Sequence, residues 1–304
     1  MSSSKIGFKK ITIKIQGGLG NQLFQFFAGL KIALDNNKTL NLDTSIYGLY
    51  SNSQNHELPF LLKYNKIASK FQVLRGFPRI RREVHIEIAR LPVQLRNTLG
   101  YFQDHELMNI SKSRTNIYLD GYYQDLALLP PFHVIDEYLQ LNSSNYNSIL
   151  KEIELIQDIQ PILLHVRRGD YLTKSAVYHE LTKNYYAAGI RYLESRLGKR
   201  EVWLISDDPK GALHLLGNEC AVDRVLDPLA LIDPDQYLEI MSHCKGIVTA
   251  NSTFSWWGAY LGYGRGTTKA VVMPSSFRQI ETISQYKTLG VNGWKILDVK
   301  GDSI

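Results

Sequence analysis

The residues of this chain that are best suited to chemistry lie in the run from Pro161 to Tyr171, PILLHVRRGDY. Residues 162–166 are rich in branched apolar side chains, which predicts a buried strand. Two arginines, a glycine and Asp170 follow the end of this strand. Ligands of open α/β sheets bind beyond the C-terminal ends of the strands, and a guanidinium group donates paired N–H bonds to phosphate oxygens. The run therefore indicates a phosphate site, and the alternative is a surface turn with solvated charges.

Two further predicted strands also end in polar residues. Residues 201–205 are followed by Ser-Asp-Asp at 206–208, and residues 246–250 are followed by Asn-Ser-Thr-Phe-Ser at 251–255. The C-terminal ends of parallel strands lie at one edge of a sheet, so the three polar clusters should converge on one crevice. The last cluster precedes a helix, whose first N–H groups suit a diphosphate without a metal ion. The alternative for this cluster is that one of its hydroxyl groups simply caps the helix.

His165 and the aspartates near the predicted sheet edge have competing interpretations. His165 alternates with Arg167 along the strand, so both side chains point to one face, and the alternative is a buried structural histidine. The run Asp233-Pro234-Asp235 superficially resembles a metal-binding Asp-x-Asp pair. However, Asp233 and Asp208 each precede a proline, which predicts helix capping with proline at the first helical position. No pair of histidines or cysteines has the spacing of a metal site, and Asp207 is the better functional candidate.

A glycine-rich turn opens the chain. Residues 11–16 predict a strand, and the run Gly17-Gly-Leu-Gly-Asn-Gln22 follows it. Residues 22–36 then predict a helix, and residues 39–43 predict a second strand. This is a βαβ unit. A dinucleotide fingerprint would need a glycine where Leu23 stands, although Asp43 lies at a suitable distance for a ribose. We prefer a turn whose Asn21 and Gln22 contact a substrate.

The elements that position these motifs alternate between strand and helix, which predicts parallel sheets. A length of 304 residues suits two domains. The polar run 142–147 marks a break, and we expect domains at 1–155 and 156–304, with residues 285–304 packing back on the first.

Charge and composition restrict the partners. The net charge of +6 favours an anionic partner. The sequence contains no run of eighteen apolar residues, so we expect no membrane span. Arginine is frequent from Arg75 to Arg96, where apolar residues lie between the arginines. Such a segment suits the surface of an anionic membrane, or it is a solvated helix face. It lacks the interleaved aromatic residues of a nucleic-acid site, so nucleic acid is not an expected partner.

These motifs together resemble the bacterial α1,2-fucosyltransferases. The resemblance rests on three motifs, His165-Val-Arg-Arg-Gly-Asp170-Tyr171, Gly17-Gly-Leu-Gly-Asn-Gln-Leu-Phe-Gln25 and Asn251-Ser-Thr-Phe-Ser-Trp-Trp-Gly258, with Asp120-Gly-Tyr-Tyr-Gln124 and Ser206-Asp-Asp208 in addition. It implies a GT-B fold of two facing Rossmann-like domains with parallel sheets. It also implies inverting transfer of fucose from GDP-β-L-fucose to the 2-hydroxyl of a galactose-type acceptor, with no cofactor and no metal ion. Such an enzyme would serve surface polysaccharide or O-antigen synthesis, in the cytoplasm or peripherally at the inner face of its membrane.

The resemblance also implies roles for single residues. Arg167 would neutralise the β-phosphate of the leaving GDP, and Asp170 would support it; no catalytic base follows from the sequence. The expected catalytic residues are Arg167, Asp170 and His165. The expected donor-binding residues are Arg168, Asp207, Asp208, Asn251, Ser252, Thr253, Phe254 and Ser255. The residues expected to contact the acceptor or fucose are Gly18, Asn21, Gln22, Tyr171 and His179. Two alternatives are an oxidoreductase that binds NAD or FAD at the first βαβ unit, and a carbohydrate-binding module that uses Trp256 and Trp257.

Overall fold

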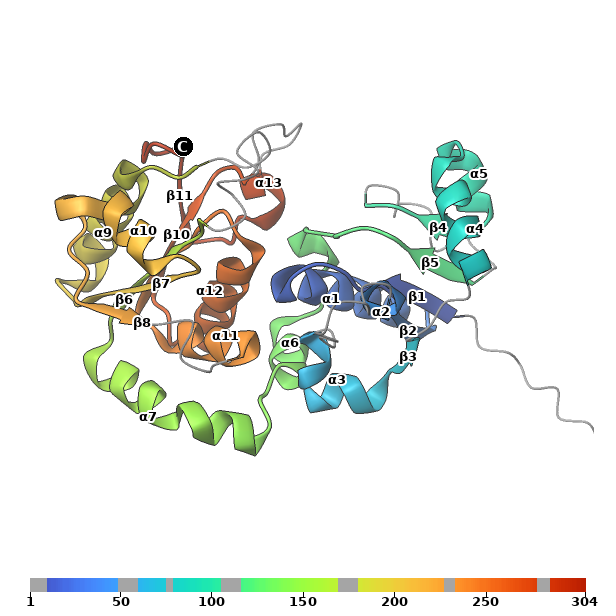
Figure 1. Cartoon of the computed structure of the whole chain (residues 1–304), viewed down its shortest axis with the longest axis horizontal. Coiled ribbons are helices and arrows are strands. Elements are labelled where there is room, and N and C mark those ends of the chain that lie inside the picture. Colours follow the sequence, from blue (N-terminus) through green and yellow to red (C-terminus); the bar gives the residue numbers. More distant parts are fainter. Residues whose placement is uncertain are drawn as a thin grey trace, which may run out of the picture. The chain divides into compact units, whose positions relative to one another are not determined.

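The computed structural model describes residues 10–48, 60–74, 79–104, 116–168, 180–226, 233–277 and 285–304. The chain divides into two compact units, Met1–Gln140 and Leu141–Ile304, and each is built around a parallel sheet of its own (Figure 1). Three predicted site residues, Asp170, Tyr171 and His179, lie outside the described residues.

The first unit contains a five-stranded sheet in the order β3-β2-β1-β5-β4, with every neighbouring pair parallel. The strands are β1 (Lys10–Lys14), β2 (Thr39–Asp43), β3 (Gln72–Leu74), β4 (Tyr101–Phe102) and β5 (Ile117–Leu119). The helices are α1 (Leu19–Asp35), α2 (Ser45–Gly48), α3 (Asn65–Lys70), α4 (Arg79–Arg90), α5 (Val93–Thr98) and α6 (Phe132–Tyr138), with short 3-10 turns η1 (Phe60–Lys63) and η3 (Leu126–Leu128).

Helix α1 connects β1 to β2, which confirms the predicted βαβ opening. It begins at Leu19, three residues earlier than expected, because Gly18 takes the N-cap position with extended backbone. At Gly29, a Cβ atom would lie 3.1 Å from the side chains of both Ile13 and Leu40. A glycine at this position therefore lets α1 pack tightly on β1 and β2.

The first sheet carries a polar network on one face. Lys14 at the end of β1 forms an ion pair of 3.0 Å with Asp120, which directly follows β5. The hydroxyl of Tyr101 donates a hydrogen bond of 2.5 Å to the same carboxylate. Three strands are thus tied together by one aspartate.

A second carboxylate of this network is almost fully buried. Asp43 accepts a hydrogen bond of 2.6 Å from the Tyr118 hydroxyl and one of 2.9 Å from the backbone N–H of Ser45. Burial and the nearby Asp43 charge raise the pKa of Tyr118, so its hydroxyl stays a donor. His85 of α4 packs on the Tyr118 ring with centroids 4.1 Å apart, which anchors α4 to the sheet.

The second unit contains a six-stranded sheet in the order β11-β10-β9-β6-β7-β8, again with every neighbouring pair parallel. The strands are β6 (Ile162–Val166), β7 (Val202–Ser206), β8 (Arg224–Leu226), β9 (Gly246–Val248), β10 (Ala270–Pro274) and β11 (Lys295–Leu297). The helices are α7 (Ser143–Ile159), α9 (Lys183–Leu197), α10 (Pro209–Leu216), α11 (Pro234–His243), α12 (Thr253–Arg265) and α13 (Gln285–Leu289), with the 3-10 turn η4 (Gly217–Glu219).

The second unit includes the whole of α7 and the end of the chain. Helix α7 packs on α11, where the Gln236 side chain donates to the backbone oxygen of Asn145 and to the hydroxyl of Ser148. The whole of α7 therefore belongs to the second unit, whereas a boundary after residue 155 would divide this helix. The end of the chain also joins this unit, because β11 pairs with β10.

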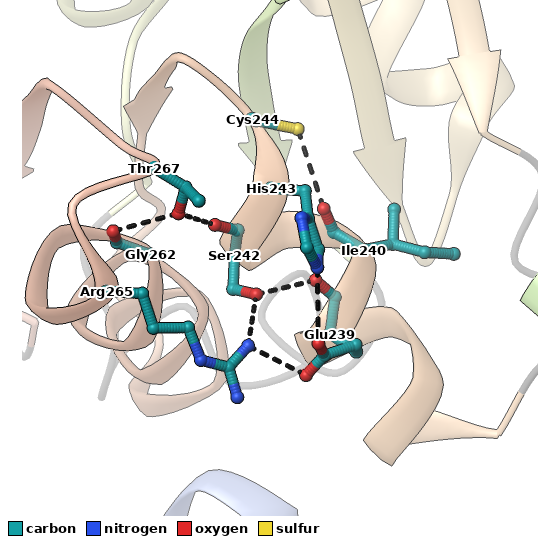
Figure 2. Close-up of polar contacts among 8 residues, drawn as sticks. All are labelled: Glu239, Ile240, Ser242, His243, Cys244, Gly262, Arg265 and Thr267. Carbon is teal, nitrogen blue, oxygen red and sulfur yellow. Dashed lines mark hydrogen bonds and ion pairs between the residues drawn. The ribbon is translucent and has the colours of Figure 1, made fainter. Parts of the chain in front are cut away.

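A polar cluster of low exposure joins helices α11 and α12 (Figure 2). Nη1 of Arg265 lies 2.9 Å from Oε2 of Glu239 and 2.8 Å from the hydroxyl of Ser242. Nε2 of His243 lies 3.2 Å from the other carboxylate oxygen. Burial alone would raise the pKa of Glu239, but His243 and Arg265 outweigh burial, and the pKa is lowered. A charged Glu239 thus fixes the C-terminal end of α12 to α11.

Two glycines of α12 permit this close packing. At Gly258, a Cβ atom would lie 2.8 Å from the side chain of Met241. At Gly262, it would lie 2.6 Å from the carbonyl oxygen of Ser242 and 2.2 Å from the hydroxyl of Thr268. Since neighbouring backbone cannot yield as a flexible side chain does, position 262 requires glycine. This packing determines where the N-terminus of α12 lies.

Candidate active site

The three polar clusters lie side by side at the carboxyl edge of the second sheet. Strands β9, β6 and β7 are consecutive neighbours and parallel, so the residues that follow them emerge at the same edge. Their convergence, which the sequence predicted, is confirmed. Such an edge is where open α/β sheets bind their ligands.

Arg167 and Asp207 form the central contact of this edge. Nη1 of Arg167 lies 3.0 Å from Oδ2 of Asp207, and the side chains are 36% and 24% exposed. A partly exposed arginine keeps its charge and can meet an anion from solvent, while the carboxylate limits the directions its guanidinium can take.

Arg168 has a different environment from Arg167. Its backbone N–H donates a hydrogen bond of 2.8 Å to Oδ1 of Asp207. Its side chain is only 17% exposed, and Nε lies 3.4 Å from Oδ2 of Asp208. A weaker ion pair of 3.7 Å joins it to the exposed Glu180. Of the two arginines, Arg167 is therefore the more accessible to a ligand.

Asp208 acts as a helix cap, as its position before Pro209 predicted. Its Oδ1 accepts a hydrogen bond of 3.0 Å from the backbone N–H of Gly211 in the first turn of α10. At Gly211, a Cβ atom would lie 2.0 Å from the other carboxylate oxygen, so the cap needs glycine there. The same interpretation holds for Asp233, which forms a capping box with Gln236 at the start of α11.

His165 is buried behind the two arginines. Its ring centroid lies 5.9 Å from that of Phe254 in the first turn of α12. Its Nδ1 has no hydrogen-bond partner among the described residues. Burial, and then the charge of Arg167, lower the pKa of His165 to about 3. The imidazole is therefore neutral near pH 7 and a weak base, and the catalytic role of His165 stays a prediction.

The turn from β9 into α12 is organised by its own polar side chains. Ser252 is the N-cap and accepts from the backbone N–H of Phe254 at 3.3 Å, which confirms the capping interpretation. The buried Ser255 hydroxyl accepts from the N–H of Ala250 and donates to the carbonyl of Ser252. Ser255 therefore shapes the turn.

Other residues of this turn are placed differently. The buried Asn251 donates a hydrogen bond of 3.1 Å to the carbonyl of Phe277. Thr253 and Phe254 begin α12 and are partly exposed. The N–H groups of this first turn lie at the positive end of a thirteen-residue helix, which suits a diphosphate. The donor-binding role predicted for residues 251–255 thus suits the backbone better than the side chains of Asn251 and Ser255.

Both tryptophans of the motif at 251–258 are fully buried. Nε1 of Trp256 donates to the carbonyl of Leu289, and its ring stacks on Tyr260 with centroids 4.7 Å apart. Trp257 packs edge-on against Trp256. Neither ring can stack on a sugar in solvent, so the alternative of a carbohydrate-binding module built on Trp256 and Trp257 is wrong.

In the glycine-rich turn of the first unit, the Gln22 side chain forms hydrogen bonds within the protein. The Gln22 amide donates to the carbonyl of Gly17 at 2.7 Å and to the Tyr47 hydroxyl at 2.8 Å. Its oxygen accepts from the backbone N–H of Leu61 at 2.9 Å. These bonds use both N–H groups and the oxygen of a buried side chain, so Gln22 holds the turn in shape. Its contact with a substrate stays a prediction.

Gly18 and Asn21 remain candidates in this turn. Gly17 has a φ of +79°, which favours glycine, and Gly18 is exposed with open space around it. Oδ1 of Asn21 accepts a hydrogen bond of 2.9 Å from the side chain of Gln124. The sequence did not identify this pairing, although Gln124 closes one of the recognised motifs.

In the described part of the chain, no group of three or more His, Cys, Asp or Glu side chains is arranged to hold a metal ion. No helix in the same part is long and apolar enough to cross a membrane.

The fold, with two α/β units that each contain a parallel sheet, is of the GT-B type. The fucosyltransferase NodZ from Bradyrhizobium matches with a TM-score of 0.52 and 16% identity, over 83% of this chain and 93% of NodZ. POFUT1 in complex with GDP matches with a TM-score of 0.50 and 16% identity, over 87% of this chain and 98% of POFUT1. At such identities the likeness concerns the fold.

The sequence comparisons define the family. Residues 96–292 match the model of glycosyl transferase family 11. The O-antigen biosynthesis glycosyltransferase WbnK of Escherichia coli is 30% identical over 81% of this chain and 88% of its own length. An alpha-1,2-colitosyltransferase of Escherichia coli is 26% identical over 91% of this chain and 95% of its own length. A galactoside 2-alpha-L-fucosyltransferase of Caenorhabditis elegans is 26% identical over 84% of this chain and 69% of its own length. The chain belongs to glycosyl transferase family 11, a family of fucosyltransferases, and the oxidoreductase alternative is therefore not supported.

Proposed function

We propose that this glycosyltransferase moves L-fucose from GDP-β-L-fucose to the 2-hydroxyl of a terminal galactose-type residue, with inversion, during surface polysaccharide or oligosaccharide synthesis. The observation that carries the proposal is the ion pair of 3.0 Å between Arg167 and Asp207 at the carboxyl edge of the second sheet. The relatives support the linkage, because two of them are named for 1,2- or 2-transfer and one for a galactoside acceptor.

The leaving group defines the task of Arg167. As the bond between the sugar and the β-phosphate breaks, negative charge grows on the phosphate oxygens. A guanidinium held in advance near this position stabilises that charge more in the transition state than in the ground state. The side chain of Asp207 orients Arg167, and the N–H groups that begin α12 would bind the same diphosphate.

Arginine and helix N–H groups supply positive charge without a metal ion, so we propose a metal-independent reaction with no cofactor. We assign Asp208 and Arg168 to the nucleotide side of the donor. Gly18 and Asn21, which are partly or fully exposed in the first unit, are the proposed contacts with the acceptor or with fucose.

The donor sugar has a second candidate, because one relative is named as a colitosyltransferase. Colitose is L-fucose without its 3-hydroxyl group. A site built to hydrogen-bond that hydroxyl rejects the deoxy sugar by roughly 10⁴-fold, whereas an apolar site rejects the added hydroxyl by only about 10²-fold. A comparison of kcat/KM for the two GDP-linked sugars therefore identifies the natural donor by the size of the preference.

The first experiment measures transfer from GDP-fucose to lactose in EDTA. We expect fucosylated product from the wild type, and a loss of kcat of at least about a hundredfold in Arg167→Ala. Arg191→Ala is the matched control, because Arg191 is an exposed arginine on α9 outside the site, and its turnover should equal that of the wild type.

The outcomes separate the parts of the proposal. Near-normal turnover by Arg167→Ala would refute the assignment of the leaving-group residue. Activity that appears only after a divalent ion is added would refute metal independence. Binding of GDP-fucose without any product would leave the donor in place and contradict lactose as a model of the acceptor.

A further inference from the structure

Exposed apolar side chains gather in one short part of the first unit. Ten large apolar side chains are exposed in the described part of the chain, and five of them lie between residues 84 and 99. Single exposed apolar residues are ordinary, whereas several within one helical segment mark an interaction surface. These five are Val84, Ile86, Val93, Leu95 and Leu99.

The segment is a helical hairpin of α4 and α5, joined at Leu91 and Pro92 (Figure 1). Nη1 of Arg96 in α5 donates to the carbonyl oxygens of Ala89 at 2.9 Å and Leu91 at 3.1 Å, so α5 is tied to the end of α4. His85 anchors α4 to the sheet through Tyr118. The hairpin is therefore held in place, and its exposed side chains are not needed for that attachment.

Helix α5 lies at the surface. None of its residues is buried, and Leu95 and Leu99 are 54% and 55% exposed. A six-residue helix with no buried residue is marginal in water. An apolar environment for its leucines would stabilise it.

The charge of the segment indicates what covers it. Residues 79–98 contain five arginines and two glutamates and no other charged residue, which gives +3 of the chain's net +6. A second copy of the hairpin would bring two such segments of like charge together. An anionic lipid surface instead has negative charge next to an apolar layer. Electrostatic attraction and the burial of apolar side chains would both favour binding to it.

We propose that the α4–α5 hairpin binds the surface of an anionic lipid bilayer, with Leu95 and Leu99 entering the interfacial layer and the net positive charge of the two helices attracted to the headgroups. The contact is peripheral. It does not rest on the sugar that is transferred, because it depends only on exposed residues of the first unit.

The test is co-sedimentation of the full chain with vesicles of phosphatidylcholine, with and without phosphatidylglycerol. We expect binding to the anionic vesicles only, and a loss of binding in molar salt, where the Debye length falls to about 3 Å. The double variant Leu95→Ser/Leu99→Ser should bind at least about tenfold more weakly, because two exposed leucines no longer enter the interface. Arg90→Gln should weaken binding about fivefold.

The matched control is Leu34→Ser. Leu34 is 61% exposed at the end of α1, outside the hairpin, and its loss should leave vesicle binding unchanged. All variants should keep the wild-type circular dichroism and turnover with a soluble acceptor.

Three outcomes would overturn the proposal. The first is equal binding to neutral and anionic vesicles. The second is an equal effect of the Leu34 and the Leu95/Leu99 substitutions. The third is a dimer in sedimentation velocity that the Leu95→Ser/Leu99→Ser variant abolishes, since the hairpin would then cover a second copy. A failed transfer assay leaves this test unaffected, because vesicle binding is read without substrate.

Discussion

Arg167 and Asp207 follow neighbouring parallel strands, and their side chains meet in an ion pair of 3.0 Å at the carboxyl edge of the second sheet. Asp207 also accepts the backbone N–H of Arg168. One carboxylate therefore holds both the backbone after β6 and the guanidinium that we assign to the leaving phosphate.

This relationship predicts the effect of Asp207→Asn. The amide keeps the size of the side chain but loses its charge, so Arg167 should sample more orientations. Partly exposed ion pairs contribute up to about 1 kcal/mol, so we expect kcat to fall by up to about fivefold and the melting temperature to fall by no more than about 2–4 °C. Asp158→Asn, at an exposed position of α7, is the control. Equal turnover of both variants would show that Asp207 does not position the arginine.

His165 predicts a dependence of stability on pH. Its pKa falls from 6.5 to about 3 on folding, so below about pH 6.5 the unfolded chain binds a proton that the folded chain does not. Stability should therefore decrease as the pH falls through this window, by up to about 1.4 kcal/mol per pH unit for this group. Urea unfolding at pH 7.5, 6.5 and 5.5 measures the slope. His165→Phe should make the slope shallower; an unchanged slope would contradict the assignment of a neutral buried histidine.

Gly262→Ala should destabilise the second unit. The added methyl group would lie 2.6 Å from the backbone oxygen of Ser242, and such overpacking costs about 1–3 kcal/mol. Thermal and urea unfolding measure the loss. Gly18→Ala is the comparison, because a Cβ atom there meets nothing within 4 Å, and its free energy of unfolding should stay within about 0.5 kcal/mol of the wild type. Similar stability of the two variants would mean that α11 and α12 separate easily.

Tyr118→Phe should destabilise the first unit. The substitution removes the hydroxyl that donates 2.6 Å to the buried carboxylate of Asp43, and the loss of a hydrogen bond to a charged group costs about 1.5–3 kcal/mol. Tyr146→Phe, at a partly exposed tyrosine of α7, should cost less than about 0.5 kcal/mol. If the two variants unfold alike, the hydrogen bond between Tyr118 and Asp43 does not stabilise the first unit.

The sequence by itself determined the local structure of the site. Apolar runs that end in polar residues identified β6, β7 and the strand that precedes the cluster at 251–255. These elements were predictable because strand periodicity and helix capping depend on residues close together in the sequence. The caps at Asp208 and Asp233 were predictable for the same reason. The convergence of Arg167, Asp207 and the start of α12 also followed, since parallel strands with intervening helices carry their ends to one edge.

Only the tertiary structure decided how single side chains are used. Gln22 and Ser255 have the polar character of ligand-binding residues, yet both are buried and bonded to backbone brought near by the fold. Trp256 and Trp257 are enclosed by the packing of α12. The attachment of α7 and β11 to the second unit likewise depends on helix and strand neighbours distant in sequence. Burial and partner choice are properties of long-range packing, and local residue patterns do not encode them.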